Sequence, residues 1–90
     1  MLAYDANLED ETLPVVIFAG STQEAVNLFC DHHLDLRGTM PGAFYVKRRT
    51  IAREADQSAL RAALRRDLAG LGVKHDAGWE IVEVGTARLS

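Results

Sequence analysis

An unbroken apolar run followed at once by a helix-start signature most constrains the fold of this chain. Residues 13–20 read LPVVIFAG, a β-branched segment ended by glycine, and this pattern predicts a strand buried on both faces. Pro14 must then lie at the beginning of that strand, where a missing N–H does least harm. Ser21 and Glu24 have the spacing of a capping box, in which Glu24 reaches back to the Ser21 amide, so a helix is predicted over residues 22–36.

This helix has an apolar side and an acidic side. With about 3.6 residues per turn, residues three and four apart share a face. The core-facing side is predicted to carry Ala25, Val26, Phe29, Cys30, His33 and Leu36.

The second half of the chain predicts two more strands and a second helix. Two glycines and a proline make residues 38–42 a turn, and β-formers between 43 and 53 predict a strand with cations on both of its faces. Such a strand cannot be core along its whole length, so it is expected to display part of its surface. Residues 75–78 predict a turn, and residues 79–84 (WEIVEV) predict a final strand.

The second helix is expected to begin at a cap on Asp56 and to run to about Gly70. Glycines at 70 and 72 are expected to end it. Its packing stripe on the sheet would consist of Leu60, Leu64, Leu68 and Leu71.

The order strand, helix, strand, helix, strand predicts a small two-layer α/β sandwich with three or four strands, within one domain spanning residues 1–90. An α+β arrangement with an antiparallel or mixed sheet is the alternative, because connection lengths do not separate the two. Residues 1–12 are expected to be either a mobile segment or a short edge strand, and residues 86–90 a loose tail.

Charge is segregated along the chain. Residues 1–36 hold seven carboxylates and no Lys or Arg, whereas residues 37–66 hold eight cations against Glu54 and Asp56, although the net charge is only −3. Unless these blocks pair within one fold, they give the surface regions of opposite potential, which bears on partners and assembly more than on catalysis.

A cytoplasmic setting is expected for this chain. Its single cysteine, Cys30, cannot form an internal disulfide, and the first residues lack the basic and apolar regions of a secretory signal. The longest apolar run, residues 15–19, is far shorter than a membrane helix needs, so no membrane insertion is expected.

Few residues suggest metal binding or catalysis. Cys30 and His33 share a helical face, and His75 is the one distant ligand of similar softness, yet no zinc motif surrounds them and a structural site needs four ligands. A Cys30–His33 nucleophile would need a third orienting group, an exposed sulfur and an oxyanion hole. A His75–Asp76 acid–base pair is also weak, because a turn holds such neighbours apart as often as together. We therefore predict no enzyme activity, no metal and no cofactor.

The cationic block is the predicted binding surface. Its favoured partner is a protein, either an acidic one or a second copy of this chain in a homodimer. The alternative is a nucleic acid, tracked by Lys47, Arg48, Arg49 and Arg53 together with the helix arginines, although the net negative charge opposes it. The predicted partner-binding residues are Tyr45, Lys47, Arg48, Arg49, Arg53, Arg61, Arg65 and Arg66.

Overall fold

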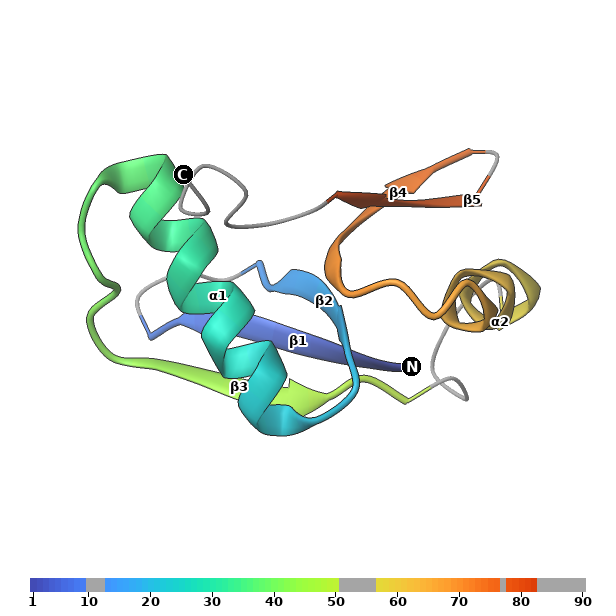
Figure 1. Cartoon of the computed structure of the whole chain (residues 1–90), viewed down its shortest axis with the longest axis horizontal. Helices are drawn as coiled ribbons and strands as arrows, with labels where there is room; N and C mark the ends of the chain where they lie inside the picture. Colours follow the sequence, from blue (N-terminus) through green and yellow to red (C-terminus); the bar gives the residue numbers. More distant parts are fainter. Residues whose placement is uncertain (10–12, 51–56, 77, 83–90) are drawn as a thin grey trace.

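The computed structural model describes residues 1–9, 13–50, 57–76 and 78–82. These residues form five strands and two helices (Figure 1). In chain order they are β1 (Leu2–Leu8), β2 (Val15–Ala19), α1 (Thr22–Arg37), β3 (Phe44–Arg48), α2 (Gln57–Arg65), β4 (Gly70–His75) and β5 (Gly78–Val82).

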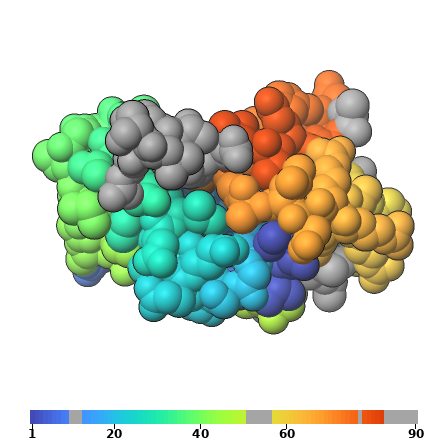
Figure 2. Space-filling view, viewed as in Figure 1, coloured from blue at the N-terminus to red at the C-terminus, as the bar shows by residue number. Residues whose placement is uncertain are grey.

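All five strands belong to one sheet with the order β3-β1-β2-β4-β5, and every neighbouring pair is antiparallel. In Figure 1, α1 lies across β1, β2 and β3, whereas α2 lies at the end of the molecule near β5. The space-filling view shows the same division, with α1 on one side of the molecule and β4 with α2 on the other (Figure 2).

This α+β architecture corrects the predicted β-α-β-α-β sandwich of three or four strands. The described residues contain five strands, and no described neighbouring pair is parallel. Two strands account for the difference, β1 and β4. The second strand, predicted from 43 to 53, is assigned only over Phe44–Arg48, and its last predicted residues lie outside the described part of the chain.

Residues 1–12 were expected to be a mobile segment or an edge strand; a strand does form over Leu2–Leu8, but β1 is an inner strand of the sheet. β1 pairs with β2 on one side and with β3 on the other. Its small residues Ala3 and Ala6 are almost completely buried, which allows helices to pack closely over both faces of the strand. Residues 10–12 lie outside the described residues.

α1 covers one face of the sheet, and its start follows the capping prediction with one change. The Ser21 hydroxyl accepts the Glu24 N–H at 3.2 Å, but the Glu24 carboxylate accepts the N–H of Gly20 at 2.7 Å rather than that of Ser21. The helix ends where Gly38, at φ 75°, donates its N–H to the Leu34 carbonyl.

The core beneath α1 joins the helix to three strands. Phe29 packs on Phe44 of β3, with 4.8 Å between ring centroids, and on Tyr4 and Ile17. Contrary to prediction, Leu36 is 65% exposed, because the last turn of α1 extends beyond the buried part of the sheet, and Leu28 packs toward the core instead.

α2 packs on the opposite face, over the residues of β1 and β2 that alternate with those facing α1. Leu60 and Ala63 are buried against Ala3, Phe18 and Trp79. The rings of Phe18 and Trp79 meet edge to face, with centroids 5.7 Å apart. The two helices therefore cover opposite faces of one sheet.

The predicted end of the second helix is wrong. α2 ends at Arg65 and is followed by Asp67 in the left-handed conformation (φ 56°), well before Gly70. Leu68 is half-exposed beyond the helix, and Leu71 belongs to β4, where it packs on the α1 side. The predicted cap on Asp56 lies outside the described residues.

Gly70 and Gly72 serve β4 rather than a helix end. A Cβ on Gly70 would lie 2.3 Å from the Val82 carbonyl oxygen of β5, and its φ of 154° disfavours other residues. A Cβ on Gly72 would lie 2.6 Å from Cε2 of Phe18 and 3.2 Å from Cε3 of Trp79. Both glycines therefore allow β4 to pass close to its neighbours.

Gly72→Ala is expected to lower the free energy of unfolding by about 1–3 kcal/mol, because the methyl group would push the Phe18 ring against Trp79 in a packed core. Urea unfolding followed by the fluorescence of Trp79, the only tryptophan, measures this change. Gly42→Ala is the control, since a Cβ there meets no atom within 4 Å. Equal stability of the two variants would contradict this account of the core.

Candidate interaction surface at the β3 edge

β3 is an edge strand, and its main-chain N–H and C=O groups point alternately toward β1 and away from it. In the described part of the chain it pairs only with β1. Arg49 N–H donates to the Ala3 carbonyl at 2.9 Å, and Glu9 N–H donates to the Ala43 carbonyl at 3.0 Å. Hydrogen-bonded and non-bonded pairs alternate in an antiparallel ladder. Every second residue counted from Ala43 to Arg49 therefore bonds to β1, and the main-chain groups of the residues that alternate with them face away from β1. Those outward-facing residues are Phe44, Val46 and Arg48.

The side chains of β3 divide between the core and the surface. Phe44 and Val46 pack toward α1. Tyr45 lies on the opposite face, is 51% exposed, and accepts a hydrogen bond from the Asn7 amide at 3.3 Å. Lys47 and Arg48 are exposed. The edge thus presents aromatic residues at its start and two cations at its end.

Arg49, one of the predicted partner-binding residues, is engaged within the fold. Its Nη1 lies 2.9 Å from Oδ1 of Asp5 in β1, and its guanidinium lies over the Trp79 ring, 6.0 Å from the centroid. The Asp5 side chain is only 13% exposed, so Arg49 balances a carboxylate that is largely removed from water. Arg49 therefore contributes to the fold whether or not it also touches a partner.

The predicted arginines of the second helix differ in their surroundings. Arg61 and Arg65 are exposed on the helix, while Arg66 Nη1 donates to the Trp79 carbonyl at 3.0 Å. Arg48 at the end of β3, Arg49 and Leu64 of α2 line one pocket of about 360 Å³. Arg53 lies outside the described residues. Of the eight predicted residues, seven are described, and three of these have hydrogen-bond partners within the fold, namely Tyr45, Arg49 and Arg66.

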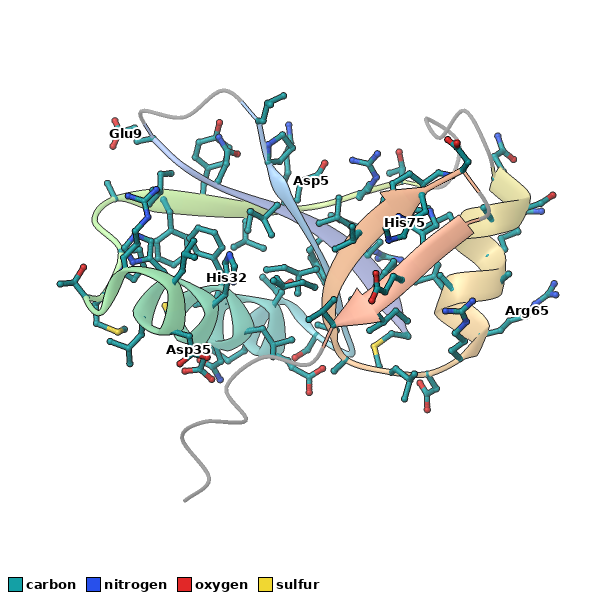
Figure 3. The ribbon with its side chains drawn as sticks, turned by 90° about the horizontal axis from the view of Figure 1, so that it is seen from above. Asp5, Glu9, His32, Asp35, Arg65 and His75 are labelled. Atoms are coloured by element: carbon teal, nitrogen blue, oxygen red, sulfur yellow. The ribbon has the colours of Figure 1, made fainter. Side chains whose placement is uncertain are left out.

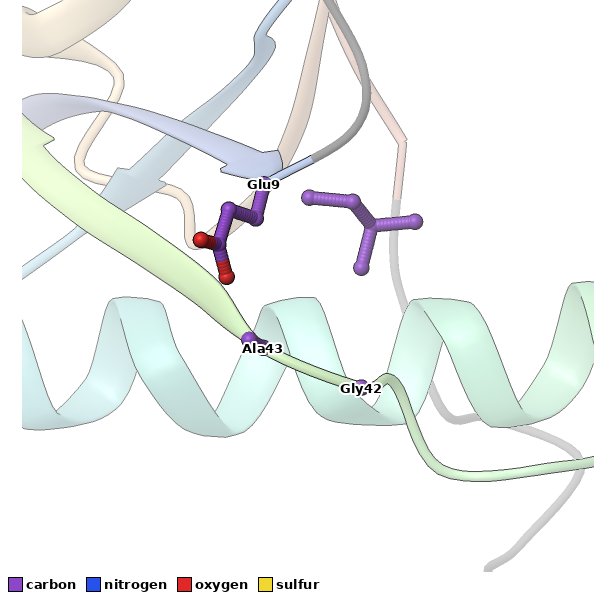
Figure 4. Close-up of a pocket in the computed structure, with 4 residues that line it drawn as sticks. Glu9, Gly42 and Ala43 are labelled. Atoms are coloured by element: carbon purple, nitrogen blue, oxygen red, sulfur yellow. The ribbon is translucent and has the colours of Figure 1, made fainter.

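The other end of the β3 edge is acidic. Glu9 is exposed, and its carboxylate lies beside the start of β3, at a shallow hollow of about 490 Å³ that Leu8, Gly42 and Ala43 also line (Figure 4). The β1–β3 register places Glu9 opposite Ala43, whereas Lys47 and Arg48 lie near Asp5 and Tyr4. The cations thus lie at one end of β3, and the carboxylate of Glu9, which follows β1, lies beside the other end.

The metal-ligand candidates are divided between α1, which holds Cys30 and His33, and β4, which holds His75. Cys30 is half-buried in α1, where His33 donates from Nδ1 to the Thr39 carbonyl at 2.7 Å. His75, in β4, lies 2.8 Å from a Glu80 carboxylate oxygen. Figure 3 shows α1 and His75 on different parts of the molecule. Among the described residues, no three His, Cys, Asp or Glu side chains are grouped so as to hold a metal ion.

Comparison of this chain with protein-family models, with curated proteins and with solved structures finds no match. Neither helix within the described ranges has both the length and the apolar character that crossing a lipid bilayer requires.

Sequence reasoning missed two features of this surface. It treated Glu9 as one of a block of acidic residues, and nothing in the residue pattern says that Glu9 lies at the end of β3. It also treated Arg49 like Arg48. The register of β1 with β3 puts the odd-numbered residues of both segments on one face of the sheet, so Asp5 and Arg49 share a face. The antiparallel register of β1 with β3 is the information that was lacking.

Arg49→Ala is expected to cost about 1–3 kcal/mol of stability, because it leaves the largely buried Asp5 carboxylate without its cation. Arg48→Ala, one residue away on an exposed side chain, is expected to change stability by no more than about 0.5 kcal/mol. Urea unfolding of both variants measures the difference. If Arg48→Ala proves the more damaging, the assignment of these two roles is reversed.

His32 is the titratable group whose pKa is shifted in the described structure. Its half-buried position in α1 lowers the pKa below the ordinary 6.5 through loss of hydration, and the nearby His33 lowers it further, while Asp35 raises it in part. The unfolded chain then binds a proton more readily than the folded one, so folding stability falls as the pH drops through and below 6.5.

His32→Gln is expected to reduce this pH dependence. The thermal midpoint of the wild type should fall between roughly pH 7.5 and pH 5.5, and the fall should be smaller in the variant. Circular dichroism melts at the two pH values supply the measurement. An unchanged pH dependence in the variant would assign the effect to other groups.

Proposed function

We propose that this chain is a non-enzymatic protein-interaction module that self-associates and places basic side chains of β3 and α2 against an acidic surface. The observation that carries the proposal is the edge of β3, which combines outward-facing main-chain groups with two exposed cations at one end and Glu9 at the other. An unpaired edge is a surface that another chain can extend, and charge sets the orientation of that chain.

A second copy of this chain is the partner that fits these charges. When two identical edges meet in opposite directions, the basic end of each copy approaches the acidic end of the other, and the same contact occurs twice about a two-fold axis. After Glu9 the sequence continues with Asp10 and Glu11, which adds negative charge to that part of the chain. Exposed ion pairs are individually weak, so their main effect is on orientation and association rate.

We also propose that the chain is cytoplasmic, and both this and the non-enzymatic part of the proposal rest on simpler observations. The His33 Nδ1 bonds to the Thr39 carbonyl, and the His75 Nε2 bonds to the Glu80 carboxylate. Neither of these two nitrogens bonds to the half-buried Cys30 thiol. The chain has a single cysteine, which is typical of proteins kept in a reducing compartment.

A nucleic acid is the second candidate partner. Tyr45 and Lys47 lie on the face of β3 that α1 does not cover, and an exposed aromatic beside a cation is an arrangement on which single-stranded bases stack. The net charge of −3 and the position of Glu9 weigh against this candidate.

Reversing both charges with Lys47→Glu and Arg48→Glu is expected to weaken self-association at least about tenfold, because each copy loses an attraction and gains a repulsion. Light scattering on a sizing column at low and high salt measures it, and circular dichroism should remain that of the wild type. Lys74→Glu in β4 is the matched control. The same reversal at Arg61 and Arg65 determines how far α2 takes part.

These measurements also distinguish the candidates. Association that weakens in salt and is lost in the β3 variant but kept in Lys74→Glu supports the proposal, whereas association unaffected by the β3 reversal would contradict it. If the wild type is a monomer with raised absorbance at 260 nm, and salt-dependent binding to a random oligonucleotide disappears in the β3 variant, the nucleic-acid function replaces it.

A further inference from the structure

We propose that two copies pair through β3 in one defined antiparallel register, with Val46 opposite the partner's Val46, so that the two sheets join into one. This inference rests on the proposed function and specifies its partner and contact geometry. The five residues of β3, FYVKR, carry the argument through their main chain, their side chains and their position in the sheet.

The main-chain groups fit this pairing without rearrangement. The bonds from Arg49 N–H to Ala3 and from Glu9 N–H to Ala43 fix which residues bond to β1. The main-chain groups that consequently face away from β1 are those of Phe44, Val46 and Arg48. Facing a copy of itself in the opposite direction, each outward residue meets an outward residue: Val46 meets Val46, and Phe44 meets Arg48. Each such pair exchanges two N–H···O=C bonds, which gives about six across the interface.

The side chains select the register. With Val46 on the axis, Phe44 lies opposite the partner's Arg48 on the α1 side, and Tyr45 lies opposite the partner's Lys47 on the other side. A cation beside an aromatic face is attracted to it. Among the antiparallel registers that match outward-facing groups, this one alone pairs every residue of β3.

The neighbouring registers are worse for identifiable reasons. Centring the contact on Lys47 sets two lysines directly opposite each other, and like charges in that position are destabilising. Centring it on Tyr45 leaves Lys47 and Arg48 opposite residues that precede β3. A parallel, in-register pairing would align all four cations of the two strands.

The acidic end of the edge reinforces the same register. Glu9 lies opposite Ala43, one step before β3 begins, and Ala43 would face the partner's Arg49. The Glu9 carboxylate is then one strand away from the partner's basic end, at both ends of the interface. This nearness of opposite charges, repeated at both ends, gives the charge complementarity that the proposed function requires.

Lysine and arginine on an edge strand also discourage indiscriminate pairing. Here the cations occupy only the last two positions of β3, so they oppose parallel and shifted pairings while leaving the antiparallel register open. Because the contact is isologous, it closes at two copies and uses both β3 edges.

The first test removes an outward hydrogen-bond donor without touching the fold of the monomer. Arg48→Pro deletes an N–H that faces away from β1, and proline is tolerated at such edge positions. Its dimer should dissociate at least about tenfold more readily than that of Arg48→Ala, which lacks the same side chain but keeps the N–H. Sedimentation equilibrium measures both, and circular dichroism verifies the fold.

The second test reads the register directly, in a Cys30→Ala background. The Tyr45→Cys and Lys47→Cys proteins are oxidised separately and as a mixture, because residues 45 and 47 would form a non-hydrogen-bonded pair with Cα atoms about 4.5 Å apart, within disulfide range. A cross-linked dimer should form in the mixture at least about tenfold faster than in either protein alone.

The outcomes separate this inference from the proposed function. Preferential cross-linking in the mixture together with a weakened Arg48→Pro dimer supports the register. Faster cross-linking of Lys47→Cys or of Tyr45→Cys alone, or equal dimerisation of Arg48→Pro and Arg48→Ala, overturns it. If the register fails while the Lys47→Glu, Arg48→Glu variant still loses self-association, the proposed function stands with a different contact. If the wild type is a monomer at every concentration, the register is overturned outright.

Discussion

The ion pair between Asp5 and Arg49 allows β1, a strand that carries a carboxylate, to occupy the interior of the sheet. β1 lies between β2 and β3, so its side chains face both helix-covered sides, and one of them is a carboxylate that is only 13% exposed. An unpaired charge there would be costly, and Arg49 compensates it at 2.9 Å while lying over Trp79. This contact joins the first strand, the end of β3 and the core beneath α2.

The surface that remains for a partner follows from this arrangement. Since Arg49 is engaged with Asp5, the exposed cations of β3 are Lys47 and Arg48, and the register of β1 brings Glu9 to the opposite end of the same edge. α1 and α2 cover opposite faces of the sheet, and among the described strands β3 has β1 as its only neighbour. The proposed self-association therefore uses the edge of the sheet and not one of its faces.

Local signals in the sequence predicted the elements whose stability is local. The Ser21 cap, the apolar run of β2 and the alternation of Phe44 and Val46 in β3 all appear as expected. β4 was not predicted, and β1 was expected only as an edge strand or a mobile segment, because their residue types are poor strand formers in isolation. Asp5 and Asn7 find partners on a strand some forty residues away, and Gly70 and Gly72 are explained only by the close approach of Val82 and Phe18.

By itself the sequence determined the composition of the two charged blocks, the start of α1 and the strand character of β2 and β3, because caps, periodicity and β-branching act over a few residues. The tertiary structure decided the strand order, the antiparallel register and therefore which cations are engaged and which are exposed. Those properties depend on pairings between distant segments, where the burial of side chains such as Ala6 and Phe18 outweighs local preference.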